Sequence, residues 1–135
     1  MTVRRSLALV LVLLIWAPLA AQTPVQRSGE DVEFLQGAYL STDTGVIVPV
    51  ATRSVTPKYT SEAMRAKLQG VVVIQAVVAA NGTVERARVT QSLDTQMGLD
   101  DAAVAAAKSW RFKPGTKDGK AVPVAVTLTL EFRLH

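Results

Sequence analysis

The sequence predicts a small α+β domain, in which a three-stranded antiparallel sheet carries two helices packed on one face. Three observations support this prediction. A short helical pattern precedes a Val-rich stretch at residues 71–80, an alanine-rich helical pattern occupies residues 99–110, and residues 122–134 alternate with a period of two. The element order is therefore helix, strand, turn, strand, helix, strand. A chain of 135 residues has room for one such domain.

The composition favours a sheet with an aliphatic core and excludes several kinds of chemistry. Aromatic residues make up 5% of the chain, so Val, Leu, Ile and Ala must build the core. Cysteine is absent, which excludes disulfides, thiolate catalysis and cysteine-based metal sites. The net charge is +4, but acidic and basic residues are interleaved, as at Glu85, Arg86 and Arg88. This pattern is typical of a solvated surface, so we expect no nucleic-acid partner.

Residues 1–21 have the pattern of a secretory signal peptide. A basic start precedes an unbroken apolar run at residues 7–17, and small residues then lead to a polar break at Gln22. We expect cleavage after Ala20 or Ala21 and export to the periplasm. The alternative is a retained inner-membrane anchor that faces the periplasm, although the run is shorter than the roughly 20 residues that a spanning helix needs.

Residues 22–45 form a mixed leader segment, and we place the domain at residues 46–135. An apolar patch at Val32–Leu35 predicts a helical turn in the leader. A second patch at Val46–Val50 predicts a short strand where the domain begins.

The first helix of the domain is predicted at residues 62–68. Thr60 or Ser61 can cap its N-terminus, because their hydroxyls accept from free backbone N–H groups. Gly70 is typical of a residue that ends a helix. The helix is short, so it must lean on a sheet to persist.

A hairpin of two strands is predicted next. Residues 71–80 are apolar on both faces, which indicates a central strand covered by a helix. Asn81-Gly82 predicts a type I′ turn, and residues 83–91 form the return strand. The apolar parity of this strand changes near Glu85-Arg86, which predicts a β-bulge there.

The second helix is predicted at residues 99–110. Leu99, Ala103 and Trp110 share one face at the helical period. Asp100 and Asp101 suit the positive N-terminal end of the helix dipole.

Residues 122–134 predict one long strand at an edge of the sheet. Thirteen residues at about 3.3 Å each span roughly 43 Å, which is more than the partner strands can pair along their whole length. Pro123 lacks an N–H, so the strand should begin at an edge. An unpaired edge can recruit another strand. The predicted partner-binding residues are Val124, Ala125, Val126, Thr127, Leu128, Thr129, Leu130, Glu131, Phe132 and Arg133.

Taken together, these segments resemble the C-terminal domain of the TonB family over about residues 46–135. The most specific piece is the run Trp110-Arg111-Phe112-Lys113-Pro114. The residues that match the family motifs are Pro57, Tyr59, Gly70, Asn81, Gly82, Leu99, Asp100, Ala103, Trp110, Phe112 and Pro114. One departure is Thr60, because the family often has proline after the tyrosine.

The resemblance implies a periplasmic binding module without a cofactor. In the family, an extended peptide of a TonB-dependent outer-membrane transporter lines up beside the last strand, in energy-coupled transport. Coupling to a proton-driven motor requires a membrane helix with a histidine, and residues 6–21 contain none. The binding half of the function therefore transfers more readily than the motor coupling.

A second interpretation comes from a different class of protein. The same edge could pair with its own copy, which would make the chain a homodimeric scaffold of the cell envelope with no role in energy transduction. Such a homodimer would have another envelope protein, and not a transporter peptide, as its binding partner. Self-pairing would bury the edge, whereas a peptide binder would leave it open.

We assign no catalytic or metal-binding residue and expect no enzyme. The single histidine, His135, is the last residue of the chain, whereas metal sites need clusters of ligands. Asp94, Asp100 and Asp101 are better explained by an acid-rich helix start than by paired carboxylates for acid–base catalysis.

Two further groups of side chains receive structural interpretations. Trp110 and Phe112 follow an amphipathic helix and are predicted to anchor the core rather than to form a binding platform. Arg111, Lys113 and Lys120, with Lys117, form a basic loop. The leading interpretation is a solvated loop, and the alternatives are contact with lipid headgroups, peptidoglycan phosphates or an acidic peptide.

Overall fold

The computed structural model describes residues 28–135. The predicted signal peptide lies outside these residues. No helix within residues 28–135 is long and apolar enough to cross a membrane.

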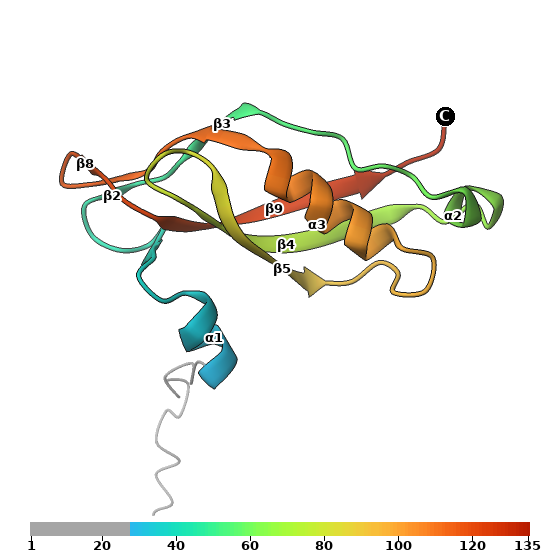
Figure 1. The fold of residues 1–135 in the computed structure, drawn as a ribbon, viewed down its shortest axis with the longest axis horizontal. Coiled ribbons are helices and arrows are strands. Elements are labelled where there is room, and N and C mark those ends of the chain that lie inside the picture. The colour runs from blue at the N-terminus through green and yellow to red at the C-terminus, as the bar shows by residue number, and fades with distance from the viewer. Residues whose placement is uncertain (1–27) are drawn as a thin grey trace, which may run out of the picture.

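The main sheet contains the three predicted antiparallel strands (Figure 1). They are β4 (Gly70–Val78), β5 (Val84–Gln91) and β9 (Val124–Phe132), and β4 lies between the other two. A two-residue strand, β1 (Tyr39–Leu40), pairs in parallel with the start of β9. The strand order is β1-β9-β4-β5, so the predicted α+β fold is confirmed with one short strand added.

Two smaller ribbons extend the main sheet. One has the order β2 (Val46–Ile47), β7 (Thr116–Lys117) and β8 (Lys120–Ala121), and the other pairs β3 (Val50–Arg53) with β6 (Arg111–Lys113). The expected strand near residues 46–50 is thus present as two short strands. The loop between β7 and β8 is Asp118-Gly119, and both residues have positive φ, as a type I′ turn requires.

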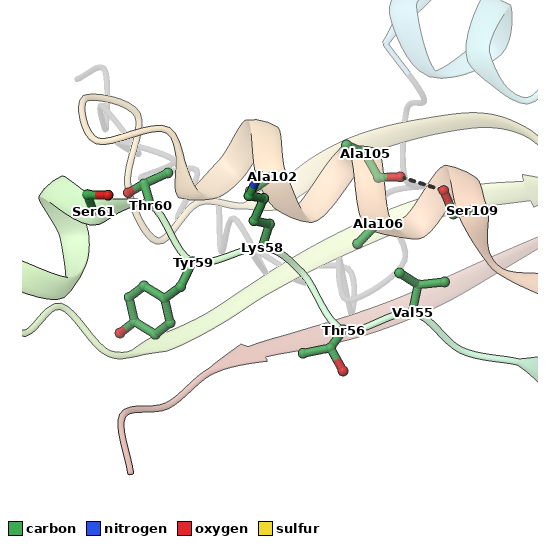
Figure 2. A pocket seen from close by; sticks show the side chains of 10 residues that line it. All are labelled: Val55, Thr56, Lys58, Tyr59, Thr60, Ser61, Ala102, Ala105, Ala106 and Ser109. Carbon is green, nitrogen blue, oxygen red and sulfur yellow. Dashed lines mark hydrogen bonds between the residues drawn. The ribbon is translucent and has the colours of Figure 1, made fainter.

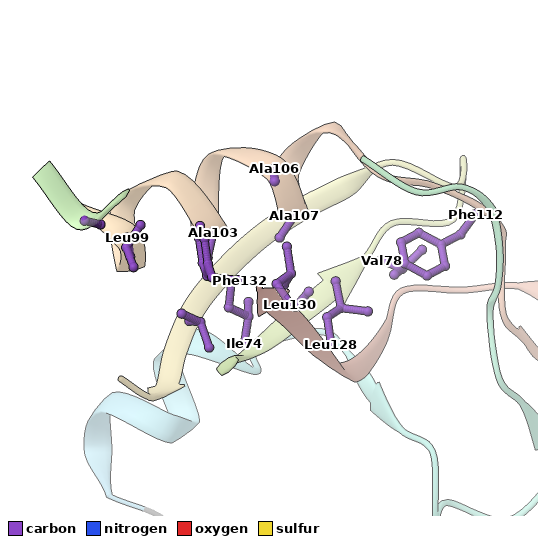
Figure 3. Close-up of a cluster of buried hydrophobic side chains, with 13 residues drawn as sticks. Ile74, Val78, Leu99, Ala103, Ala106, Ala107, Phe112, Leu128, Leu130 and Phe132 are labelled. Atoms are coloured by element: carbon purple, nitrogen blue, oxygen red, sulfur yellow. The ribbon is translucent and has the colours of Figure 1, made fainter. Parts of the chain in front are cut away.

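In the described part of the chain, residues 28–135, three helices lie around the main sheet. α3 (Leu99–Ser109) lies across one face, and α2 (Ser61–Arg65) contributes Ala63 to the same core. These are the two predicted helices. α1 (Gly29–Phe34) lies on the opposite side of the sheet from α3 (Figures 1 and 3).

The core lies between α3 and the facing side of the sheet (Figure 3). Because side chains alternate along a strand, the even-numbered residues of β4 and β9 point toward the helix. The short side chains of α3 let the helix approach the sheet closely. The buried cluster includes Val72, Ile74, Ala76, Val78, Leu99, Ala103, Ala106, Ala107, Phe112, Leu128, Leu130 and Phe132.

The first predicted helix is shorter than expected, and Gly70 has a different role. Thr60 caps α2 by accepting a hydrogen bond of 3.2 Å from the N–H of Ala63. The helix ends before Lys67, which has a left-handed φ of 53°. Gly70 begins β4 instead of ending the helix, and a Cβ there would lie 2.6 Å from Leu93 Cδ1. The expectation for Gly70 was therefore wrong.

The hairpin between β4 and β5 is present, but its turn is not type I′. Gly82 has φ 86°, whereas Asn81 does not have a positive φ. Gly82 N–H donates to Ala79 O, and Ala79 N–H donates to Thr83 O. This is a three-residue loop with glycine at its left-handed position. Asn81 instead uses its side chain, which accepts from both the N–H and the hydroxyl of Thr83.

The bulge that the sequence predicts in β5 is confirmed. Val77 pairs with Arg86 and Val78 pairs with Val84, which leaves Glu85 as the extra residue. The bulge resolves the change in apolar parity, because Val84 and Ala87 can both pack against the core.

The last strand is shorter than predicted. β9 covers nine residues, and β4 pairs with all nine of them. The prediction of a thirteen-residue strand that outruns its partners was therefore wrong. Lys120 and Ala121 form β8, Val122 and Pro123 lie in no strand, and the chain joins the main sheet at Val124.

Candidate functional site

The candidate site is the outer edge of β9. Along a strand, the N–H and C=O groups of successive residues point to opposite sides. Pro123 O accepts a hydrogen bond of 2.9 Å from Tyr39 N–H, so the backbone of Pro123 points away from β4. Since β4 and β9 pair without a register shift, residues 125, 127, 129 and 131 point the same way.

Three residues of this edge offer unpaired backbone groups. Tyr39 and Leu40 pair with Val124 and Ala125, so the start of the edge is already covered. Beyond them lie the outward N–H and C=O groups of Thr127, Thr129 and Glu131. Within residues 28–135, no backbone hydrogen bond reaches these groups from the outer side of β9. The open edge therefore has the length of a short peptide strand.

The two faces beside this edge differ in chemistry. Val126, Leu128 and Leu130 point toward α3, and Val126 is only half-buried. Thr127, Thr129 and Glu131 point to the opposite face, and all three are exposed. A strand added here would meet aliphatic neighbours on one face and hydroxyl and carboxylate neighbours on the other.

The structure narrows the predicted set of partner-binding residues. Val124 and Ala125 already pair with β1 and are buried, with exposed fractions of 0% and 6%. Arg133 follows the end of β9, and its guanidinium forms an ion pair with Glu131. The residues that can pair with an incoming strand are thus those from Val126 to Phe132.

No sequence pattern predicted β1, whereas the helical turn expected at Val32–Leu35 is present as α1 (Gly29–Phe34). Tyr39-Leu40 is too short for a periodic signal, so only the fold could reveal that it joins the sheet. α1 is held by Arg86, whose guanidinium donates to the carbonyls of Phe34 (2.5 Å) and Gln36 (2.8 Å) at the end of the helix. These bonds satisfy carbonyl groups that a helix end leaves free.

A second arginine of β5 strengthens this attachment. The Arg88 guanidinium lies 4.3 Å from the centre of the Phe34 ring and forms an ion pair of 2.5 Å with Asp31. The same guanidinium donates to Gln75 Oε1 on β4. The Ser28 hydroxyl and then the Arg88 guanidinium hold the pKa of Asp31 below its usual value. α1 is thereby fixed to the sheet face that α3 does not cover.

The far end of the open edge lies beside the segment that follows β3. A hollow of about 200 Å³ is lined by residues of that segment, including Val55 and Pro57, and by Thr129 and Glu131. Trp110 Nε1 donates to Val55 O at 3.0 Å, which fixes this segment against α3. An incoming strand would therefore have a wall of ordered side chains next to its end.

The family-motif residues act mainly as structural anchors. Tyr59 packs edge-on against Phe132 with ring centres 5.4 Å apart, and its hydroxyl donates to Leu68 O. Trp110 and Phe112 stack with their ring centres 6.1 Å apart, which confirms the prediction that they anchor the core. These contacts position the C-terminal end of β9 and the segment beside it.

The aspartates at the start of α3 organise a loop. Asp100, only 9% exposed, accepts hydrogen bonds from the Ser92 hydroxyl (2.5 Å) and from the N–H groups of Leu93 and Asp94. Burial acts to raise the pKa of Asp100, but these hydrogen bonds outweigh it and lower the pKa. Asp94 accepts in turn from Met97 N–H. The expected helix-end role of Asp100 thus includes pinning the loop that leads from β5. Among residues 28–135, no group of three or more acidic or histidine side chains could hold a metal ion.

A separate groove of about 450 Å³ runs between α3 and residues 55–61 (Figure 2). Its walls include Ala102, Ala105 and Ser109 on the helix and Tyr59 on the facing segment. The Ser109 hydroxyl is already bonded to Ala105 O. The helix side of the groove consists of small side chains, and we assign the groove no ligand.

These elements define a class of fold: a small α+β domain with an open strand at one side of its main sheet. The family described as Gram-negative bacterial TonB protein C-terminal matches residues 55–134, and the chain belongs to this family. The predicted resemblance is therefore confirmed.

Individual relatives agree with this assignment. Protein TonB of Xanthomonas campestris pv. campestris is 34% identical over 94 residues, which cover 69% of this chain and 42% of that protein. Protein tonB2 of Pseudomonas aeruginosa is 34% identical over 79 residues, which cover 58% of this chain and 29% of that protein. This chain thus spans less than half the length of these curated relatives.

One solved structure is also similar to this chain. The solution NMR structure of the Pseudomonas aeruginosa TonB CTD matches with 21% identity and a TM-score of 0.48, covering 72% of this chain and 96% of that one.

Proposed function

We propose that this protein is a binding module of the bacterial periplasm that captures an extended peptide of an outer-membrane transporter by strand addition to β9. The observation that carries the proposal is the outward backbone of Thr127, Thr129 and Glu131, which has no partner among residues 28–135. Membership of the TonB C-terminal family supports the choice of a TonB-dependent transporter as the partner. In this role the protein binds and carries out no catalysis.

Strand addition fits the chemistry of this edge. Each outward residue can exchange two main-chain hydrogen bonds with a peptide, and these bonds do not depend on the sequence of the peptide. Sequence preference then comes from the neighbours on the two faces. Peptide side chains beside Val126 and Leu128 should be aliphatic, and those beside Thr127 and Thr129 should be small or polar.

The family's role in energy-coupled transport is part of the same proposal. A module that binds a transporter peptide can transmit a force or a conformational change to the transporter only while the peptide is bound. Peptide capture is therefore the step of this role that residues 28–135 can perform.

The test is substitution of Thr127 by proline, with Thr127→Ala as the matched control. Thr127→Pro removes an outward N–H and leaves the hydrogen bonds to β4 in place, because the N–H of Thr127 points away from that strand. Thr127→Ala changes the side chain and keeps the N–H. Synthetic plug-segment peptides of TonB-dependent transporters should bind Thr127→Pro about tenfold more weakly than wild type. Thr127→Ala should bind within about twofold of wild type.

Two other outcomes would reject the proposal. Equal binding by wild type and Thr127→Pro, with both melting as folded proteins, would show that the β9 edge is not the peptide site. Sedimentation that shows a stable dimer of wild type and a monomer of Thr127→Pro, with no peptide binding by either, would favour the homodimeric scaffold.

The location of the protein is tested separately. We propose export through a cleaved signal peptide at residues 1–21, on the sequence pattern alone. Intact mass of the protein from the periplasmic fraction should correspond to a chain that starts at Ala21 or Gln22. A full-length chain in the inner-membrane fraction would show a retained anchor facing the periplasm.

A further inference from the structure

A second surface of the molecule combines exposed aliphatic side chains with cations. It is formed by residues 46–53 and by the segment 111–121 that pairs with them. The whole first segment precedes the residues that match the family, which begin at residue 55. We call this surface the β3–β6 face.

The cations of this face are placed by the strand geometry. Phe112 points into the core, so its neighbours Arg111 and Lys113 point outward from β6. Lys113 pairs with Val50, and Arg111 pairs with Arg53 across the ribbon, so these four side chains share the outward face.

Neighbouring strands add further positive charge. Lys117 and Lys120 pair with each other on β7 and β8. Residues 44–61 contain no acidic residue, and neither do residues 102–117. Asp118 is the one acid within the two segments of the face, against five basic residues. Basic residues therefore outnumber acids on this face, although Asp118 lies 3.8 Å from Lys117.

Exposed aliphatic side chains gather in the same place. The exposed fractions are 66% for Ile47, 46% for Val48 and 58% for Val50. Among residues 28–135, six large hydrophobic side chains are strongly exposed, and these three lie within four residues of each other. Solvent exposure of such a cluster is unfavourable unless another phase or molecule covers it.

We propose that the β3–β6 face docks on a lipid surface with anionic headgroups. Arg53, Arg111 and Lys113 bind the phosphates, and Ile47, Val48 and Val50 enter the boundary between headgroups and acyl chains. Cations flanking aliphatic side chains are the combination that holds a protein at a lipid interface. The free edge of β9 lies on a different strand from these residues, so docking does not use its outward backbone groups.

The shape of the face favours a lipid surface over an acidic peptide. A peptide that binds through its side chains, and not by strand addition, needs pockets or a groove to bury them. Three hollows of the described surface are lined by other residues, and Ile47, Val48 and Val50 are exposed. A fluid interface needs no groove, because the lipids adapt to projecting side chains.

The test uses the absence of native cysteine, which allows one label per chain. The variant Ile47→Cys, purified in the processed form that the wild type takes after export, is labelled with a fluorophore that brightens in apolar surroundings. Val32→Cys is the matched control, because Val32 is 59% exposed but lies on α1. Each is mixed with vesicles of phosphatidylcholine alone or of phosphatidylcholine and phosphatidylglycerol in equal parts.

The label at position 47 should brighten with the phosphatidylglycerol vesicles severalfold more than the label at position 32. This response should weaken at high salt, because screening reduces attraction to the headgroups. Reversing both cations of β6, Arg111→Glu with Lys113→Glu, should raise the vesicle concentration needed for half of the fluorescence response at least about tenfold. The reversal Arg65→Glu with Lys67→Glu, on and just after α2, is the charge-matched control and should leave the response in place.

Three results would overturn the proposal. The first is an equal response of the labels at positions 47 and 32, because it would assign vesicle binding to another part of the chain. The second is a response that the β6 reversal leaves unchanged. The third is a response to polyglutamate but not to vesicles, which would assign the face to acidic peptides.

Discussion

Tyr39 donates its N–H to Pro123 O at 2.9 Å, and this bond marks where the covered part of the β9 edge ends and the open part begins. It also fixes which residues of β9 point outward, because backbone groups alternate along a strand. A segment that precedes the family match by more than a dozen residues thereby determines how much of the edge a partner can use.

The alternation itself predicts a pattern of hydrogen exchange in the free protein. The N–H groups of Val126, Leu128 and Leu130 point toward β4 and should be protected by its carbonyls. Those of Thr127, Thr129 and Glu131 point outward and should exchange at least about a hundredfold faster. NMR measurement of amide exchange checks this without a ligand. Slow exchange at all six positions would show that the edge is covered in solution, as in the homodimer.

Gly82 provides a prediction about stability. Its φ is 86°, and a Cβ there would lie 2.0 Å from the Phe112 carbonyl oxygen. The N–H of Phe112 donates a hydrogen bond of 2.8 Å to Gly82 O, which holds the two backbones together. Gly82→Ala should therefore cost about 3 kcal/mol or more of unfolding free energy, from backbone strain and from a forced shift of β6. Urea denaturation measures the loss.

The matched control for that substitution is Gly119→Ala. Gly119 has φ 84°, but nothing lies within 4 Å of a Cβ built there. Gly119→Ala should therefore lower the unfolding free energy by only about 1 kcal/mol, the cost of the left-handed conformation for a residue with a Cβ. Equal losses at the two positions would mean that the contact of Gly82 with Phe112 is not what restricts position 82 to glycine.

Asp100 makes stability depend on acid pH. Its pKa is lower in the folded protein than the usual value near 3.9, because its hydrogen bonds outweigh its burial. The carboxylate therefore stabilises the fold fully above the unfolded-state pKa, and this contribution is lost as the pH falls through the folded-state pKa. Asp100→Ala should cost about 2–3 kcal/mol at neutral pH, since it leaves the Ser92, Leu93 and Asp94 donors without their acceptor.

The pH dependence separates this role from simple packing. The loss of stability between pH 5 and pH 2 should be smaller in Asp100→Asn than in wild type, because the amide does not titrate. Asp101→Asn changes an exposed carboxylate on the same turn and should cost less at neutral pH than Asp100→Ala. An Asp100→Asn protein with the full wild-type loss in acid would assign the pH dependence to other groups. Unfolding in urea at several pH values gives these comparisons.

The sequence predicted the parts of this molecule that long periodic patterns describe. β4, β5 and α3 have eight to eleven residues each, and the packing of α3 follows from the spacing of Leu99 and Ala103. Short elements could not be predicted in this way, because a two-residue strand such as β1 has no periodic pattern. Its position depends on tertiary pairing with Val124, which no local pattern reports.

Turn chemistry shows the same limit. Both Asn81-Gly82 and Asp118-Gly119 have the sequence of a type I′ turn, but only the second adopts it. At Gly82, the hydrogen bond from Phe112 N–H and the approach of the Phe112 carbonyl select a loop with one left-handed residue. The candidate edge was predicted from Pro123 and the alternating strand, whereas its open portion became visible only once β1 was placed.

The attachment of α1 gives the last prediction. Arg88 stacks on Phe34 and forms an ion pair with Asp31, and these contacts join α1 to the sheet. Both side chains of the ion pair are partly exposed, so solvent screening weakens the ion pair and the stacking on Phe34 is the larger part of the attachment. Arg88→Ala should therefore raise the population of detached α1 about fivefold, with a smaller rise for Arg88→Lys, which keeps the charge but loses the planar contact. Limited proteolysis within residues 28–45, compared with cleavage after α3, measures detachment. Equal proteolysis of wild type and Arg88→Ala would show that Arg86, through the carbonyls at the end of α1, is sufficient to hold the helix.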